Sequence, residues 1–326
     1  MSTIAIVGAS GLTGSKLCEI LTDKLDGEKI VMYSNASVGQ KLCYFGKTYT
    51  VKHIDSLKDD DVDYALFMTN EEVSAKYIPQ LVEKKVVCID NSSAFRMKKD
   101  VPLVVPQINA QDIGRCKLVS NPNCTTIQVA IALAPLQKLG MEHLTVVTYQ
   151  AASGAGKEGL TDLTEKRTYG KLKSFPHPLF DNVIAQIGNV LPSGNTTEEN
   201  KLRFETGKIL HQSSLAVNAF CVRVPVTVGH CAFVNVRLQQ SFEIEQIRSL
   251  LKNTKDVLLF DDAQQQLFPM PAVLRHTHFV GVGRIFRDDT GKGVNMFVVA
   301  DNLLRGAAYN AYQILIQCMK NNGDLQ

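Results

Sequence analysis

Residues 3–14, TIAIVGASGLTG, decide the fold of the N-terminal half, because a short β-rich apolar run leads directly into a glycine turn. Residues 15–25, SKLCEILTDKL, follow with apolar side chains at helical spacing. The stretch therefore predicts a strand, a glycine turn and a helix. Glycines at such a turn let the backbone approach a pyrophosphate at the helix N-terminus, so dinucleotide binding is favoured over a merely structural turn.

Further strands and helices alternate up to about residue 140. The apolar runs that predict them are Lys29–Tyr33, Tyr64–Met68, Val86–Ile89 and Lys117–Val119 for strands, and Val73–Glu83 and Ile127–Leu136 for helices. Strands that alternate with helices indicate a doubly wound, Rossmann-like parallel sheet.

The pattern changes in the second half. A polar stretch at 157–208 separates strands expected at Leu144–Gln150, 216–226, 231–238 and Val294–Val299, and an apolar-faced helix is expected at Leu303–Met319. This half indicates an α+β domain with a mainly antiparallel sheet. We expect a dinucleotide-binding domain at 1–127, completed by the C-terminal helix at 303–326, and a catalytic and dimerisation domain at 128–302.

Composition excludes several classes of protein. With 326 residues, 45% hydrophobic and 21% charged, the chain has the composition of a globular protein of about two domains. A net charge of +3 gives no electrostatic footprint for nucleic acid or an anionic membrane. No apolar run approaches the ~20 residues of a membrane span, and the start resembles no signal peptide, so we expect a cytoplasmic protein.

One of the eight scattered cysteines has the setting of a nucleophile. Residues 121–126, NPNCTT, place Cys124 between a predicted strand and a predicted helix. A helix N-terminus stabilises a thiolate, and its amides can hold an oxyanion. The other seven cysteines are expected to be small buried hydrophobes.

Two later segments carry further polar groups. Gln150 ends a predicted strand and is followed by Gly154, and RVPVTVGH at 223–230 pairs Arg223 with His230. Arginine suits a bidentate carboxylate contact, and histidine suits proton transfer near neutral pH. His276 and His278 have no third ligand at sensible spacing, so no metal site is expected.

Other candidates are weaker. Arg96, in the loop after a predicted strand, suits phosphate binding. Glu198 and Lys201 share a helix face, and by themselves they indicate a solvated surface pair. The end of the second strand, Tyr33 to Ser37, has neither the acidic residue typical of NAD sites nor the arginine typical of NADP sites.

Taken together, the motifs resemble the aspartate-β-semialdehyde dehydrogenase family, most closely its bacterial members, over nearly the whole chain. The motifs occur in the family's order: GASGLTG (8–14), DNSSAFR (90–96), VPLVVPQIN (101–109), SNPNCTT (120–126), YQAASGAG (149–156), FPHPLFDN (175–182), EENK (198–201), RVPVTVGH (223–230) and ADNLLRGAA (300–308). The related N-acetyl-γ-glutamyl-phosphate reductases differ around the cysteine.

The resemblance implies roles for individual residues. The catalytic residues are expected to be Cys124 as nucleophile, His230 as acid/base, and Gln150 as a substrate-placing amide. Substrate binding is expected from Arg223, Arg96, Lys201, Glu198 and Asn123. Cofactor binding is expected from Gly8, Ser10, Gly11, Leu12, Thr13, Gly14, Ala36, Ser37, Ser153, Gly154 and Asn302.

The resemblance also implies the reaction: NADPH-dependent reductive dephosphorylation of L-aspartyl 4-phosphate through a Cys124 thioester, in the aspartate pathway to lysine, methionine and threonine. It implies inorganic phosphate as a co-substrate and a homodimer, with a tetramer left open. An N-acetyl-γ-glutamyl-phosphate reductase-like enzyme and a catalytically silent dinucleotide-binding relative are the alternatives.

Two departures from the family pattern bear on the cofactor. Ala36 stands where members usually carry arginine, which weakens the expected NADP preference and leaves NAD open. Asn70-Glu71-Glu72 replaces a glycine pair, and carboxylates there suit cofactor phosphates only if they point outward.

Overall fold

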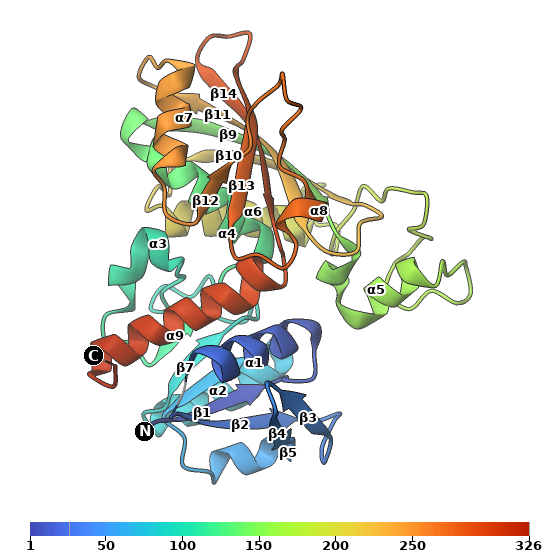
Figure 1. The fold of residues 1–326 in the computed structure, drawn as a ribbon, viewed down its shortest axis with the longest axis vertical. Coiled ribbons are helices and arrows are strands. Elements are labelled where there is room, and N and C mark those ends of the chain that lie inside the picture. Colours follow the sequence, from blue (N-terminus) through green and yellow to red (C-terminus); the bar gives the residue numbers. More distant parts are fainter. Residues whose placement is uncertain (26, 326) are drawn as a thin grey trace. The chain divides into compact units, whose positions relative to one another are not determined.

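The chain forms two compact units in a computed structural model that describes residues 1–25 and 27–325 (Figure 1). The first unit contains residues 1–122 and 307–326, and the second contains residues 123–306. The limits expected from the sequence, 127 and 303, lie a few residues from these boundaries.

A six-stranded parallel sheet forms the first unit. Its order is β5 (Lys52–His53), β2 (Lys29–Ser34), β1 (Thr3–Val7), β6 (Tyr64–Phe67), β7 (Val87–Asp90) and β8 (Leu118–Ser120). The helices of this unit are α1 (Leu12–Lys24), α2 (Glu71–Glu83), α3 (Pro106–Asn109) and α9 (Tyr309–Asn322). The chain winds outward from β1 in both directions, so the end of β1 is the topological switch point where such sheets bind ligands. This confirms the Rossmann-like fold.

The second unit contains a six-stranded mixed sheet. Its order is β10 (Ala216–Arg223), β9 (Met141–Gln150), β11 (His230–Leu238), β14 (Gly293–Ala300), β13 (Val280–Arg287) and β12 (Val257–Leu259). The β9–β10 and β12–β13 pairs are parallel and the other three pairs are antiparallel. The mainly antiparallel sheet expected for this half is therefore confirmed.

The helices of the second unit are α4 (Cys124–Leu133), α5 (Gly156–Thr164), α6 (Thr197–Ile209), α7 (Ile244–Lys252) and α8 (Pro271–Leu274).

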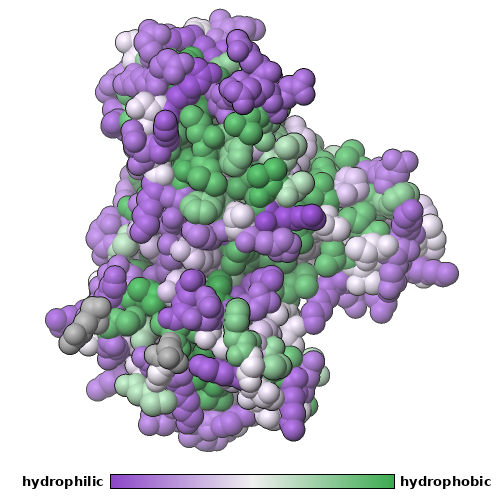
Figure 2. Space-filling view, viewed as in Figure 1, coloured by the Kyte–Doolittle hydropathy of each residue, from purple (hydrophilic) through white to green (hydrophobic). Residues whose placement is uncertain are grey.

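The two faces of the sheet in this unit differ in burial. Val146 and Val234 are fully buried, whereas Tyr149 and Phe220, which project from the opposite face, are exposed. Figure 2 shows hydrophobic residues gathered over the part of this unit where β13 and β14 lie, with hydrophilic residues around them.

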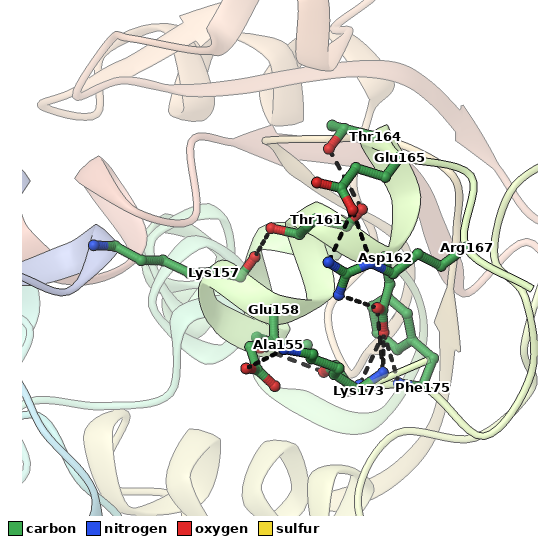
Figure 3. Close-up of polar contacts among 11 residues, drawn as sticks. Ala155, Lys157, Glu158, Thr161, Asp162, Thr164, Glu165, Arg167, Lys173 and Phe175 are labelled. Carbon is green, nitrogen blue, oxygen red and sulfur yellow. Dashed lines mark hydrogen bonds and ion pairs between the residues drawn. The ribbon is translucent and has the colours of Figure 1, made fainter. Parts of the chain in front are cut away.

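A buried carboxylate orders the polar segment that follows α5. Asp162 accepts hydrogen bonds from the backbone N–H groups of Ser174 (2.8 Å) and Lys173 (3.1 Å) and from the Arg167 guanidinium (3.3 Å) (Figure 3). Phe175, whose N–H also points to this carboxylate, packs in a small apolar cluster with Leu163 and neighbouring side chains. A side chain thus supplies the partners that a strand or helix would give to these backbone groups.

Some elements were not expected from the sequence. They are the hairpin β3 (Lys41–Tyr44) and β4 (Lys47–Thr50), the short strands β5 and β12, the strand β13, and helices α3, α5, α7 and α8. The predicted last helix begins with a turn of π-helix, Leu304–Ala308, before α9. Within residues 1–25 and 27–325, no helix combines the length and the apolar character needed to cross a membrane.

Candidate active site

The glycine turn between β1 and α1 requires its glycines. Gly8 has φ +86°, and a Cβ there would lie 2.4 Å from the Met68 carbonyl oxygen. A Cβ at Gly14 would lie 2.1 Å from the Gly8 carbonyl oxygen. The first turn of α1 therefore packs directly on the backbone that precedes it, as a pyrophosphate-binding turn requires.

The N-terminus of α1 is open to an anion. Gly11 occupies the N-cap position, and no side chain accepts a hydrogen bond there. The first amides of a helix have no partner within the helix, so those of Leu12, Thr13 and Gly14 suit phosphate oxygens. The residues expected to hold the dinucleotide phosphates thus have a fitting arrangement.

The loop after β2 carries small neutral side chains. The Ser10 and Ser37 hydroxyls lie 2.7 Å apart, and the Ser34 hydroxyl accepts a hydrogen bond from the Ala36 N–H (3.2 Å). This loop therefore carries hydroxyl groups that suit a ribose, and no charged side chain that distinguishes a 2′-phosphate.

The carboxylate of Glu71, at the start of α2, is exposed and accepts a hydrogen bond from the Ser93 hydroxyl (2.6 Å).

Arg96 lies in the first unit, in the loop that follows β7. Its side chain is buried, and Nη2 donates to the Asn91 carbonyl oxygen (2.7 Å). Asp90 supports the same loop by accepting hydrogen bonds from the Ser92 and Ser74 hydroxyls (both 2.7 Å). Burial raises the pKa of Asp90, although these hydrogen bonds and the Arg96 charge oppose that shift.

Cys124 is the first residue of α4 in the second unit. The Asn123 side chain caps this helix by accepting hydrogen bonds from the Thr125 N–H (2.9 Å) and the Thr126 N–H (3.3 Å). Cys124 itself is partly exposed, so a reagent can reach it at the positive end of the helix dipole.

The other thiols have different surroundings. The structure describes all eight cysteines, and none of them forms a disulfide bond. Burial raises the pKa of Cys18, Cys221, Cys231 and Cys318 to about 12, and that of Cys88 also rises. These five thiols stay protonated and unreactive near neutral pH. Cys43 and Cys116 are exposed, so the expectation of burial is wrong for these two.

Glu198 is buried and accepts hydrogen bonds from three side chains, whereas the sequence alone indicated a pair with Lys201 on the surface. Its Oε1 accepts hydrogen bonds from Asn123 Nδ2 (2.9 Å) and Gln150 Nε2 (3.2 Å), and its Oε2 accepts one from Lys201 Nζ (3.1 Å). Burial opposes the charge on Glu198, but Lys201, Asn123 and Gln150 together hold its pKa below the ordinary value. The solvated pair expected from helical spacing alone is therefore wrong, because α6 turns this face inward.

The Ala151 peptide joins Arg223 to His230. Its N–H donates to His230 Nδ1 (3.0 Å), and its carbonyl oxygen accepts a hydrogen bond from Arg223 Nη1 (2.6 Å). Burial and the Arg223 charge lower the pKa of His230 to about 3. Because Nδ1 accepts a hydrogen bond, the neutral ring carries its proton on Nε2. That buried Nε2 has no hydrogen-bond partner among the described residues, so it is available to a ligand.

Three expected cofactor residues lie beside this histidine. A Cβ on Gly154 would lie 3.0 Å from His230 Nε2 and 2.8 Å from Arg223 Nη1, so a larger residue there would displace these side chains. Asn302 is buried, accepts a hydrogen bond from the Gly229 N–H (2.9 Å) and donates to the Ser153 hydroxyl (3.0 Å). Asn302 thereby ties the residue before His230 to the loop that carries Gly154.

Sequence reasoning missed two residues next to the nucleophile. Glu205 Oε2 accepts a hydrogen bond from the Asn123 N–H (2.7 Å). A Cβ on Gly306 would lie 3.0 Å from Cys124 Cβ, so the π-helical turn approaches Cys124 closely through a glycine. The motif ADNLLRGAA contains Gly306, but only the folded contact distinguishes it from the other glycines.

The HTH segment is held by its backbone and by one ring contact. The His276 backbone N–H donates to Asp301 Oδ2 (2.7 Å), and the His278 and Phe279 rings pack at a centroid distance of 4.2 Å with their planes tilted by 33°. Across the described part of the chain, no cluster of three or more His, Cys, Asp or Glu side chains is arranged to hold a metal ion.

Comparisons with known proteins agree along the chain. Two family models match: "Semialdehyde dehydrogenase, NAD binding domain" over residues 3–116 and "Semialdehyde dehydrogenase, dimerisation domain" over residues 133–305. The aspartate-semialdehyde dehydrogenase of Aquifex aeolicus is 39% identical over 326 residues, covering 95% of this chain and 96% of the relative. That of Bacillus subtilis is 37% identical over 338 residues and covers 98% of both chains.

A solved structure has the same fold. The crystal structure of aspartate semialdehyde dehydrogenase II from Vibrio cholerae, complexed with ASA, is similar with a TM-score of 0.92 and 35% identity, covering 98% of each chain. The matched domains, the relatives and this fold place the chain in one family: it belongs to the aspartate-semialdehyde dehydrogenases.

Proposed function

We propose that this protein reduces L-aspartyl 4-phosphate to L-aspartate 4-semialdehyde, with release of inorganic phosphate. The observation that carries this proposal is the surrounding of Cys124 in the second unit. A partly exposed thiol at a capped helix N-terminus adjoins the Asn123–Glu198–Gln150 hydrogen-bond chain, and the charge of Cys124 acts on Arg223. Membership of the family supports the same reaction.

Arg223 and Glu198 suit the two charged groups of an amino acid. Arg223 is a buried cation at the end of β10, and burial lowers its pKa, so it gains from an anionic partner such as the substrate carboxylate. The buried Glu198 carboxylate is held ionised and faces Lys201. We assign Glu198 to the substrate ammonium group and Lys201 to phosphate. The assignment of Arg96 to phosphate rests on its motif alone.

The tautomer of His230, with its proton on Nε2, makes this side chain a hydrogen-bond donor to the substrate in the reaction. The Cys124 thiolate forms a bond to the acyl carbon, the carbon–oxygen bond to phosphate breaks, and a thioester remains. His230 donates from Nε2 to the carbonyl oxygen as negative charge develops on it. When bound, the nicotinamide cofactor supplies the hydride that reduces the thioester. The resulting oxyanion, held by the hydrogen bond from His230 Nε2, collapses: the carbon–sulfur bond breaks, the aldehyde leaves and the thiolate is regenerated.

The cofactor is assigned to the glycine turn of the first unit. The uncapped N-terminus of α1 fits a pyrophosphate, and the hydroxyls of Ser10 and Ser37 fit a ribose. We propose NADP as the cofactor, with NAD as the alternative because Ala36 carries no charge. Ser153, Gly154 and Asn302 are assigned to the nicotinamide end.

The assay that tests this proposal measures phosphate-dependent reduction of NADP and NAD with L-aspartate 4-semialdehyde. We expect turnover only with phosphate present, and loss of turnover in Cys124→Ser. Faster turnover with N-acetylglutamate semialdehyde would assign the protein to the related reductases. Cofactor binding without any turnover, in folded protein with reduced Cys124, would support the silent relative instead.

We further propose a homodimer in the cytoplasm. The outward face of the second sheet exposes Tyr149 and Phe220, with Phe233 and Phe297 partly buried beside them, in the part matched by a dimerisation domain. Apolar residues gathered on one face are typical of an interface. Sedimentation velocity tests the dimer, and Phe220→Asp is expected to yield monomers.

The proposed location in the cytoplasm rests on the cysteines, because eight free thiols suit a reducing compartment.

A further inference from the structure

Helix α6 presents two buried carboxylates to one residue, Asn123. Glu198 accepts a hydrogen bond from the Asn123 side-chain amide (2.9 Å), and Glu205 accepts one from the Asn123 backbone N–H (2.7 Å). Seven residues separate the two glutamates, which is close to two helical turns, so they lie on the same face. Glu205 is only 1% exposed, so water does not replace it as an acceptor.

Asn123 uses all its polar side-chain groups and its N–H in this arrangement. Its Oδ1 caps α4 at Thr125 and Thr126, its Nδ2 donates to Glu198, and its N–H donates to Glu205. It also stands where the chain enters the second unit, directly before Cys124. The conformation of Asn123 therefore sets where the first turn of α4 presents the thiol.

We propose that Glu205 is a positioning residue, which fixes the Asn123 peptide and thereby the orientation and charge of the Cys124 thiol. This inference rests on the proposed function of Cys124 as the nucleophile. Glu205 acts through Asn123 and is assigned no contact with substrate. Because Glu205 contacts the backbone of the residue directly before Cys124, a carboxylate there also opposes thiolate formation.

Glu199 offers a matched control on the same helix. It too is a buried carboxylate that accepts backbone hydrogen bonds, from the N–H groups of Thr196 (2.6 Å) and Cys221 (3.1 Å). Those bonds cap α6 and hold β10 but do not reach Asn123. Loss of Glu199 therefore reports the cost of removing a buried carboxylate from α6 without releasing the nucleophile.

The experiment measures alkylation of Cys124 by iodoacetamide, by mass spectrometry across pH 5–10, beside thermal unfolding. For Glu205→Ala we expect a folded protein whose kcat falls by about tenfold or more, with KM for the semialdehyde changed less, and whose Cys124 alkylation profile differs from the native one. Glu205→Gln keeps an acceptor for the Asn123 N–H, so it should restore most of the rate. Because the charge is gone, its alkylation profile should shift to lower pH. Glu199→Ala should lower Tm while alkylation stays within about twofold of the native rate.

Two results would overturn the inference. One is a folded Glu205→Ala with the native alkylation rate and profile, or one that loses no more than Glu199→Ala. The second result counts if Glu205→Ala does not fold. It is a pH profile of Cys124 alkylation in Glu205→Gln that coincides with the native profile. The proposed function fails separately, because native protein whose Cys124 alkylates no faster than the exposed Cys43 has no activated nucleophile.

Discussion

Two turns of this chain lead from a strand into a helix, and they use the helix N-terminus in opposite ways. After β1, the N-cap of α1 is Gly11, which supplies no side chain to the helix amides. After β8, the N-cap of α4 is Asn123, whose side chain occupies two of those amides. The first arrangement leaves amides for an external anion, whereas the second fixes the residue that follows, Cys124.

The comparison shows that the N-cap residue decides what a helix N-terminus does. A bare N-cap costs helix stability but leaves a phosphate site. A capped one stabilises the helix and orients a side chain in its first turn. The following changes test this difference and the sites around the two helices, in order of expected effect.

Removal of the fixed side chain has the largest effect. Cys124→Ala should lower kcat by about 10⁴-fold or more, because no thioester forms. Thermal unfolding should stay near that of the native protein, since Cys124 is only partly buried. Cys43→Ala, at an exposed thiol, serves as the control and should retain native turnover. Comparable losses in both variants would contradict the assignment.

A methyl group in the glycine turn should disrupt the first arrangement. At Gly14 it would meet the Gly8 carbonyl oxygen, so Gly14→Ala should cost about 1–3 kcal/mol of stability and weaken cofactor binding. Gly46→Ala is the control, because φ there is +77° but nothing lies within 4 Å of the added atom. Chemical denaturation and cofactor titration measure both effects. Equal destabilisation would mean that the contact with the Gly8 carbonyl oxygen is not the cause, because Gly46 has a positive φ and Gly14 has none.

Exchanging the caps tests the comparison directly. Asn123→Ala removes a cap and should cost about 1 kcal/mol of stability as well as activity. Gly11→Ser adds a hydroxyl where the backbone is extended, as an N-cap requires. It should leave stability within about 1 kcal/mol of native but raise the KM for NADPH about tenfold, because the hydroxyl competes for the phosphate amides. An unchanged KM would mean that the α1 N-terminus does not hold the cofactor.

His230 should give the stability of the protein a pH dependence. Its pKa falls from 6.5 to about 3 on folding, because of burial and the Arg223 charge. The unfolded chain therefore binds a proton below pH 6.5 that the folded chain does not. Stability is fully present above that pH and falls towards pH 3 by up to about 1.4 kcal/mol per pH unit. Urea denaturation between pH 5 and 7 should show this slope in native protein and in His177→Asn, but not in His230→Asn.

The smallest expected effect concerns the ribose loop. Ala36→Arg places a cation beside the Ser34–Ser37 loop and should raise the preference for NADP over NAD by about tenfold. The ratio of the two kcat/KM values measures it, and kcat with NADPH should change little. A ratio that falls would place the 2′-phosphate away from this loop.

Much of the fold was predictable because its signals are local. The apolar runs of β1, β2, β6, β7, β8 and β9 and the glycine turn each lie within a few adjacent residues. The hairpin β3–β4, the edge strand β12 and its neighbour β13 escaped prediction. β3, β4 and β12 are short and largely exposed or half-buried, so they have no apolar run of their own, and Gly281 and Gly283 interrupt the apolar run of the buried strand β13.

The sequence by itself determined the strand–turn–helix order, the thiol at the start of a helix and, through its motifs, the resemblance to a family. Only the tertiary structure decided which polar groups share a buried environment. Helix α6 turns Glu198 and Glu205 towards Asn123, the Ala151 peptide selects the tautomer of His230, and Gly306 packs against Cys124. These contacts join residues far apart in the chain, and burial, which sets their charge and strength, is a property of the assembled fold.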